Sequence, residues 1–137
     1  MACDAALQPF LQHDAGAFAR RVLHGLRLDT DRQAAGDDGR VAALGSPSTL
    51  HTFAARTSSV PGSSRALGWD TMLPTSSCGI RMSPNAFGHV GFTGTSLWID
   101  PGRDRYFVLL TNRVCGGGTV DQMRTVRRAF HDALGST

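Results

Sequence analysis

The sequence contains no lysine and no glutamate: all 14 basic residues are arginine and all 11 acidic residues are aspartate. This absence excludes every mechanism in which the chain itself supplies a lysine amine or a glutamate base. Long hydrophobic runs are absent too, since no stretch approaches the roughly 20 apolar residues of a membrane-spanning helix. The start, Met1-Ala2-Cys3-Asp4, has neither the basic nor the apolar region of a signal peptide. We therefore expect no membrane span and no signal peptide in this chain.

The charge that is present is mild and scattered. The net charge is +3, and the clustered arginines fall on two predicted helices, at 20–21 and 124–128. A nucleic-acid surface needs a basic stripe with stacking aromatics, so we interpret these arginines as solvated helix faces and expect no nucleic-acid partner. Four histidines lack an i, i+4 partner among the histidines and cysteines: His13, His24, His51 and His131. We therefore expect them at surface or helix-terminal positions, and we expect no metal site and no cofactor.

Length and apolar content suit one domain with a single modest core, because the chain has 137 residues and is 41% hydrophobic. The residue patterns predict helices over 15–25, 47–56 and 119–134, and strands over 66–71, 87–93, 95–99 and 105–112. Asp100-Pro101-Gly102 has the chemistry of a turn between neighbouring strands. We therefore predict an α+β fold with an antiparallel sheet, in which residues 1–60 are helical and 61–137 carry the strands and the last helix.

Each of the three predicted helices has an expected cap and an expected apolar face. Ser46 caps the helix over 47–56, where Leu50 and Phe53 are expected to face inward. Asp14 caps the helix over 15–25, where Phe18, Val22 and Leu26 recur at i, i+4 and i+8. Thr119 caps the last helix, whose predicted buried stripe consists of Val120, Met123, Val126, Phe130 and Leu134.

The stretch 87–113 holds the most informative residues. It predicts a hairpin with a histidine, His89, at the start of a strand, followed by Gly91 and Gly94. Glycine inside a strand often marks close approach of a ligand or another backbone, and an edge strand of this kind can bind a substrate by strand addition. A hairpin with a hydrogen-bonded histidine near a bend explains the same residues. The spacing alone leaves both interpretations open.

The same stretch resembles the third motif region of the serine β-lactamase and penicillin-binding-protein superfamily, most closely the class C β-lactamase and esterase branch. In that superfamily a Lys-Thr-Gly or His-Xaa-Gly triad opens a strand at the edge of the active site. Here the triad is His89-Val90-Gly91, and its continuation GFTGTSLWIDPGRDRYFVLLTNR is similar to the next two sheet strands. Upstream, PGSSRALGWDT (Pro61–Thr71) is similar to the strand entry of the same branch.

The resemblance implies that two motifs of the family lie outside this chain. The nucleophile of the family is the serine of Ser-Xaa-Xaa-Lys, which a sequence without lysine cannot contain. The second motif carries Tyr-Xaa-Asn or Ser-Xaa-Asn, whereas the single tyrosine, Tyr106, lies in an apolar strand. We therefore expect residues 1–137 to be the C-terminal portion of a β-lactamase-related serine hydrolase domain, with a partial β-lactamase/transpeptidase-like fold and little or no activity alone.

Carried over by position, the resemblance assigns five residues to the site. His89 is expected to hydrogen-bond near the nucleophile and to orient the substrate, and the backbone amide of Phe92 is expected to be one oxyanion donor. Val90 departs from the more frequent threonine, which removes a hydroxyl contact to a β-lactam carboxylate. Gly91 is expected to let the substrate approach closely. Thr93 completes the expected substrate-binding segment, and no metal is implied.

The resemblance also sets the expected partners. The complete enzyme acts on a small acyl substrate or a peptide, and the uncovered sheet edge suggests a complementing N-terminal chain or a homodimer. An alternative is a non-catalytic module that uses the same edge strand to bind a peptide or another protein. The serines of 57–65 and 76–83 lack a lysine at i+3 and a Gly-Xaa-Ser-Xaa-Gly context, so we interpret them as loop residues.

Overall fold

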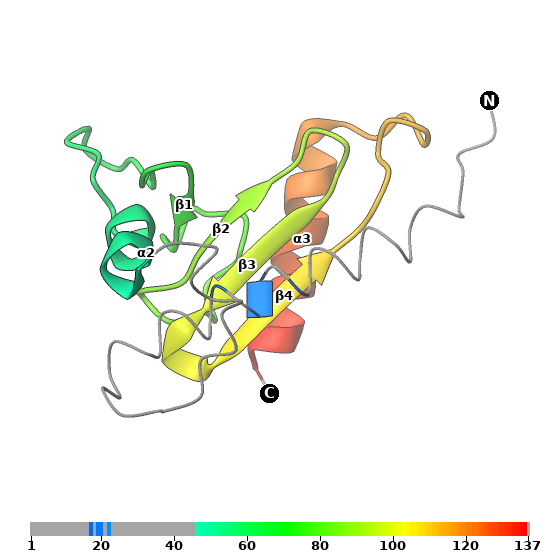
Figure 1. Ribbon diagram of the computed structural model, residues 1–137. Coiled ribbons are helices and arrows are strands. Elements are labelled where there is room, and N and C mark those ends of the chain that lie inside the picture. Colours follow the sequence, from blue (N-terminus) through cyan, green and yellow to red (C-terminus); the bar gives the residue numbers. More distant parts are fainter. Residues whose placement is uncertain (1–16, 18, 21, 23–45, 137) are drawn as a thin grey trace.

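The computed structural model describes residues 17, 19, 20, 22 and 46–136 (Figure 1). Within this part of the chain the order is α2 (Pro47–Ala54), β1 (Asp70–Thr71), β2 (Phe87–Val90), β3 (Ser96–Asp100), a 3₁₀ turn (Pro101–Arg103), β4 (Arg105–Leu109) and α3 (Val120–Gly135). The strands form an antiparallel sheet in the order β1-β2-β3-β4. The predicted α+β class is therefore confirmed.

Helix α2 begins where the sequence supplies a cap. The Ser46 hydroxyl accepts a hydrogen bond from the Thr49 amide at 3.2 Å, and Pro47 occupies the first turn, where a missing N–H costs nothing. The predicted helix over 47–56 is thus confirmed, although it ends two residues earlier. Leu50 packs against the core as predicted, but the inward position predicted for Phe53 was wrong, because its side chain is 48% exposed. Most of the predicted helix over 15–25, including its cap Asp14 and Phe18, lies outside the described residues; Ala17, Ala19, Arg20 and Val22 are helical.

Three of the predicted strands are shorter in the structure. The strand expected over 87–93 ends at Val90, because the Gly94 amide donates to the Gly91 carbonyl at 3.1 Å and closes a turn. The strand expected over 105–112 ends at Leu109. Of the strand expected over 66–71, only Asp70 and Thr71 join the sheet.

Helices cover both faces of the sheet. On one face Phe87 and Ile99 pack against Ala19 and Val22, with Leu50 and Ala54 of α2 at the margin. Arg20 on this side donates to the Tyr106 hydroxyl at 3.1 Å. On the other face the buried cluster consists of Cys78, Met82, Ala86, Trp98 and Phe107. Helix α3 lies on this second face, behind β3 and β4 in Figure 1, and its His131 ring contacts both Trp98 and Phe107.

Helix α3 buries a different stripe from the one predicted. Its cap Thr119 is as predicted, with the Thr119 hydroxyl accepting from the Gln122 amide. The Gln122 side chain accepts in return from the Thr119 amide, which completes a capping box. The buried residues, however, are Met123, Arg127, His131 and Gly135. Val120, Val126 and Leu134 of the predicted stripe are exposed, so that prediction was wrong except at Met123 and, in part, at half-buried Phe130. The prediction of a surface or helix-terminal position was wrong for His131 as well, because this residue is fully buried and lies before the last turn of α3.

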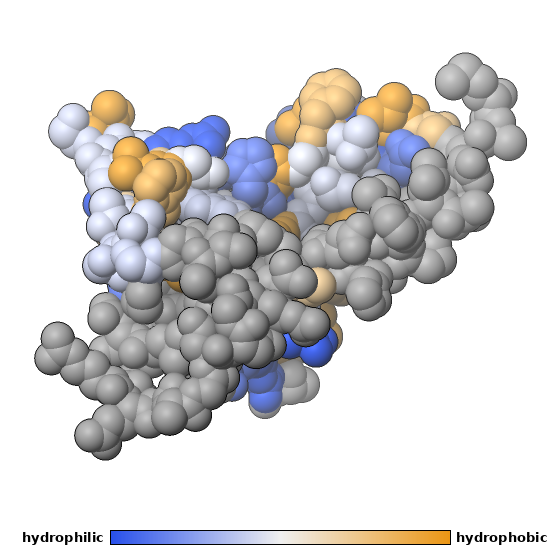
Figure 2. All heavy atoms as spheres, in the orientation of Figure 1, coloured by the Kyte–Doolittle hydropathy of each residue, from blue (hydrophilic) through white to orange (hydrophobic). Residues whose placement is uncertain are grey.

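The described helices include none that is long and apolar enough to cross a membrane. Large apolar side chains do reach the surface at several loops and helix ends. Figure 2 shows them at both upper ends of the molecule, and the exposed residues include Val60, Leu67, Phe92, Val114 and Val120.

Candidate functional site

The outer edge of β2 is only half covered by β1. Asp70 and Thr71 pair with Gly88 and Phe87, and the register goes no further along β2. The Gly91 amide donates to the carbonyl of Thr95, the residue just before β3, at 2.8 Å. Because backbone groups alternate in direction along an antiparallel strand, the N–H and C=O of Val90 point away from β3. They therefore lie at an edge with which no described strand pairs.

His89 lies beside this edge with its side chain exposed. It pairs in register with Leu97, so it shares a face with Leu97 and Phe87. That is the face opposite α3. The imidazole of His89 is thus accessible on the side of the sheet where Ala19 and Val22 pack farther along.

The turn Gly91–Gly94 follows directly and presents Phe92 and Thr93 to solvent. The Phe92 side chain is 77% exposed. Gly94 has φ +117°, a backbone conformation that residues other than glycine rarely adopt, and a Cβ there would overlap the Thr111 hydroxyl. A Cβ on Gly91 would likewise overlap the Thr95 hydroxyl. The contact with Thr95 therefore explains glycine at position 91 without reference to a ligand.

Two arginines hold the carbonyl groups of the turn. Arg127 of α3 donates through Nη2 to the Gly91 carbonyl at 2.6 Å and to the Thr95 carbonyl at 3.0 Å. Arg113 donates through Nε to the Phe92 carbonyl at 2.6 Å, and its backbone amide donates to the Thr93 carbonyl at 2.8 Å. The Arg113 guanidinium also lies 4.2 Å from the centre of the Phe92 ring. The turn is therefore fixed from behind by charged donors.

The residues behind Arg127 form an unusually polar interior. His131 is fully buried, and its Nε2 lies 3.0 Å from the Ser96 hydroxyl. The pKa of His131 is lowered to about 4, mainly by burial and in addition by the positive charge of Arg127. The nearby Asp132 raises this pKa, but by less. His131 is therefore neutral at pH 7. Within the described residues, His131 Nδ1, Arg127 Nε and Trp98 Nε1 are buried without a hydrogen-bond partner.

Neither arginine that holds the turn was predicted as a site residue. Arg127 was interpreted as part of a solvated face, but it is buried and lies in one row with Met123, His131 and Gly135. The row has the i, i+4 spacing of a helix face, which is a signal in the sequence, although two of its members are polar. Arg113 had no such signal, because its partners are backbone carbonyls.

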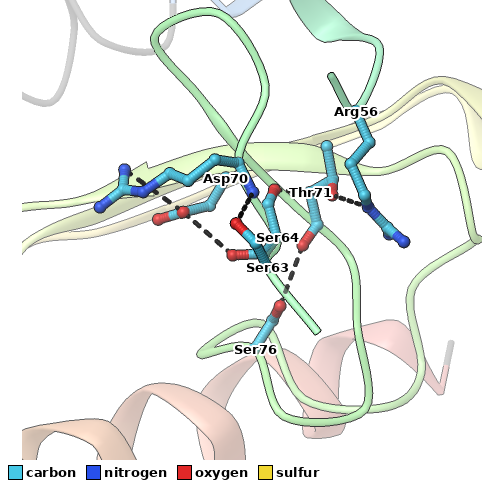
Figure 3. Close-up of polar contacts among 7 residues, drawn as sticks. Arg56, Ser63, Ser64, Asp70, Thr71 and Ser76 are labelled. Carbon is cyan, nitrogen blue, oxygen red and sulfur yellow. Dashed lines mark hydrogen bonds and ion pairs between the residues drawn. The ribbon is translucent and has the colours of Figure 1, made fainter. Parts of the chain in front are cut away.

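The loop serines hold loops together, and Figure 3 shows those that lie around β1. Ser64 donates to Asp70 at 3.2 Å, Ser76 donates to the Thr71 carbonyl at 2.9 Å, and Arg56 donates to the Thr71 hydroxyl at 2.8 Å. Ser83 donates through both its amide and its hydroxyl to the buried carboxylate of Asp100. These hydrogen bonds give the serines a structural role.

A cavity of about 520 Å³ opens at the other end of β2. It lies between the end of α2, β1 and the segment before β2, and its lining includes Arg56, Thr71 and Phe87. The Arg56 guanidinium is already engaged by the Thr71 hydroxyl and the Met72 carbonyl. In the part of the chain that the structure describes, no three histidine, cysteine or aspartate side chains gather as they would around a metal ion.

Comparison with known proteins gives one finding. A family model described as Beta-lactamase matches residues 14–131. No curated protein and no solved structure matches the chain. The matched range includes β2, the turn Gly91–Gly94 and both arginines that hold it.

Proposed function

The chain belongs to the beta-lactamase family, and on this premise we propose that it supplies the His-Xaa-Gly edge strand of a serine hydrolase site without supplying the nucleophile. The observation that carries the proposal is the open edge of β2 at Val90, flanked by the exposed His89 and by the turn with the Phe92 amide. The sequence contributes the second half of the argument, since a chain without lysine has no Ser-Xaa-Xaa-Lys.

In the complete site the reaction is acyl transfer. A serine oxygen attacks the carbonyl carbon of an ester, amide or β-lactam, the C–O or C–N bond to the leaving group breaks, and the leaving group takes a proton. Water then cleaves the acyl-serine ester and releases the acid. His89 orients the substrate at the edge, Val90, Gly91 and Thr93 lie along it, and the Phe92 amide binds the oxyanion. The His-Xaa-Gly triad favours the class C and esterase branch of the family.

A second candidate function is a binding module without catalysis. It is favoured by the free N–H and C=O of Val90, since an extended peptide can add to such an edge as a further strand. The two candidate functions require different partners. The hydrolase needs a chain with the nucleophile, whereas the module binds a peptide alone.

The test combines covalent labelling with complementation. Intact mass after incubation with a fluorescent penicillin and, separately, a fluorophosphonate measures acylation, and size exclusion establishes that the sample is folded. We expect no adduct on this chain alone. Coexpression with the N-terminal part of a beta-lactamase-family enzyme, up to the point equivalent to residue 14, is expected to produce one adduct per complex, on the serine of that part.

Two variants connect the labelling to the edge strand. His89→Ala is expected to slow labelling of the complex, whereas the control His51→Ala, an exposed histidine on α2, is expected to leave it unchanged. An adduct on a serine of this chain alone contradicts the proposal. So does a complex that is labelled at the same rate with and without His89. Binding of an extended peptide by the chain alone, with no labelling of the complex, favours the module.

A further inference from the structure

The peptide group between Gly91 and Phe92 lies between a buried charge and solvent. Its carbonyl accepts from Arg127, and because the described peptide bonds are trans, its N–H points the opposite way. The next peptide group repeats the arrangement, with the Phe92 carbonyl accepting from Arg113 and the Thr93 N–H pointing away. Neither N–H has a hydrogen-bond partner among the described residues. The turn therefore offers two adjacent free donors.

No opposite charge neutralises the two guanidinium groups within the described part of the chain. The ion pairs there join Arg65 to Asp70 and Arg103 to Asp100, and neither involves Arg113 or Arg127. Arg127 is 5% exposed, so water screens its charge poorly. A cation hydrogen-bonded to a carbonyl oxygen draws electron density through the peptide group, and this makes the N–H on the other side a stronger donor.

We propose that Arg127 is a positioning residue that strengthens the Phe92 N–H as an oxyanion donor, and that Arg113 does the same for the Thr93 N–H. Together the two amides form a site for a carboxylate or a developing alkoxide. The use of this site in acyl transfer rests on the proposed function. The polarisation itself does not, because it needs only the contacts within this chain.

Hydroxide-catalysed hydrogen exchange at the two amides tests the proposal. Exchange removes the amide proton and leaves an imidate anion whose charge lies largely on the carbonyl oxygen, the atom to which the arginine donates. Removing the positive charge with Arg127→Met is expected to slow exchange at Phe92 about tenfold, measured by NMR on the folded chain. A merely structural role predicts the reverse, because a loosened turn exchanges faster.

Three further variants complete the design. Arg127→Lys keeps the charge and is expected to restore most of the exchange rate at Phe92. Arg128→Met changes the neighbouring arginine, which donates to the Pro74 and Ser76 carbonyls, and is expected to leave the rate unchanged. Arg113→Met keeps the backbone hydrogen bond to Thr93 and is expected to slow exchange at Thr93 and not at Phe92. If Arg127→Met does not fold, exchange at Thr93 in Arg113→Met still tests whether an arginine on the carbonyl strengthens the amide of the same peptide group.

Unchanged or faster exchange at Phe92 in folded Arg127→Met, or at Thr93 in Arg113→Met, overturns the proposal. The outcome is independent of the labelling experiment. If exchange slows as expected while the complemented complex is never acylated, the polarised turn stands and the hydrolase function fails. If acylation succeeds and exchange does not slow, the hydrolase function stands and the role of the arginines is withdrawn.

Discussion

Two buried side chains on one face of α3, Arg127 and His131, differ in their charge state. Arg127 remains a cation because its ordinary pKa lies so far above neutrality that burial, which lowers that pKa, leaves it charged. His131, one turn later, is neutral because burial and the charge of Arg127 together lower its pKa to about 4. The charge of the pair is thus concentrated on the residue that contacts the turn.

The neutral state of His131 makes stability depend on pH. Its pKa is lower in the folded chain than the unperturbed value of about 6.5, so between these values the unfolded chain binds more protons. Stability is therefore constant for this group above about pH 6.5 and falls as the pH decreases to about 4, by up to about 3 kcal/mol. Urea unfolding across this range measures the loss. His131→Gln, which keeps a hydrogen-bonding group for Ser96, is expected to flatten the slope, and an unchanged slope rules this explanation out.

The backbone at Gly94 makes that glycine difficult to replace. In Gly94→Ala the new Cβ both occupies a φ of +117° and overlaps the Thr111 hydroxyl, so we expect a loss of about 2–4 kcal/mol. Gly62→Ala is the matched control, because Gly62 also has a positive φ, +74°, but nothing within 4 Å of the added carbon. Its expected cost is about 1 kcal/mol. Equal losses in denaturant unfolding would show that the Thr111 contact contributes nothing.

Cys78 is expected to be chemically inert in the folded chain. It is fully buried, and burial raises the pKa of its thiol to about 12. At pH 8 its thiolate fraction is then about 10³-fold below that of an ordinary thiol. Iodoacetamide followed by peptide mapping is expected to leave Cys78 unmodified in native buffer and to modify it in urea. Rapid native labelling at this residue would contradict the burial.

At the scale of the elements, helix α3 shows where residue patterns predict well and where they fail. Thr119 predicted its start, because a cap is a local interaction between neighbours in sequence. The buried stripe was mispredicted, because the row that faces the sheet contains Arg127 and His131. Hydrophobicity alone ranks Val120 and Val126 above these two residues. It takes no account of the carbonyls and of the Ser96 hydroxyl that pair with the polar side chains.

The observed orientation of α3 predicts a contrast between two apolar residues that the pattern treats alike. Met123 is buried, so Met123→Ala is expected to cost about 2–4 kcal/mol of unfolding free energy. Val126 is 49% exposed, and Val126→Ala is expected to change it by no more than about 0.5 kcal/mol. Denaturant titration of both variants measures the difference. A larger loss from Val126 would mean that the predicted stripe was right after all.

At the scale of the whole molecule, the sequence predicted the α+β class and the family, and it predicted the antiparallel sheet with strand ends a few residues too long. These features depend on periodicity, turn residues and a collinear motif. The hairpin was placed correctly because glycine and Asp-Pro-Gly mark its turns. The five residues assigned to the site, from His89 to Thr93, remain proposals. The arginines behind the turn were not foreseen. Arg127 lies in a row of helical spacing that hydrophobicity alone does not select, and Arg113 binds backbone oxygens, which leave no partner residue type in the sequence.

The bridge that Arg127 makes from α3 to the carbonyls of Gly91 and Thr95 couples two parts of the molecule energetically. Such coupling is reciprocal. If packing of α3 raises the affinity of the turn for an anion, then a bound anion stabilises the packing of α3 by the same free energy. Under the proposed anion site, amides in the middle of α3 are expected to exchange more slowly when an anion binds the turn, although the anion does not touch the helix. Substitutions on the buried face of α3 are then expected to change the affinity of the hairpin for the anion.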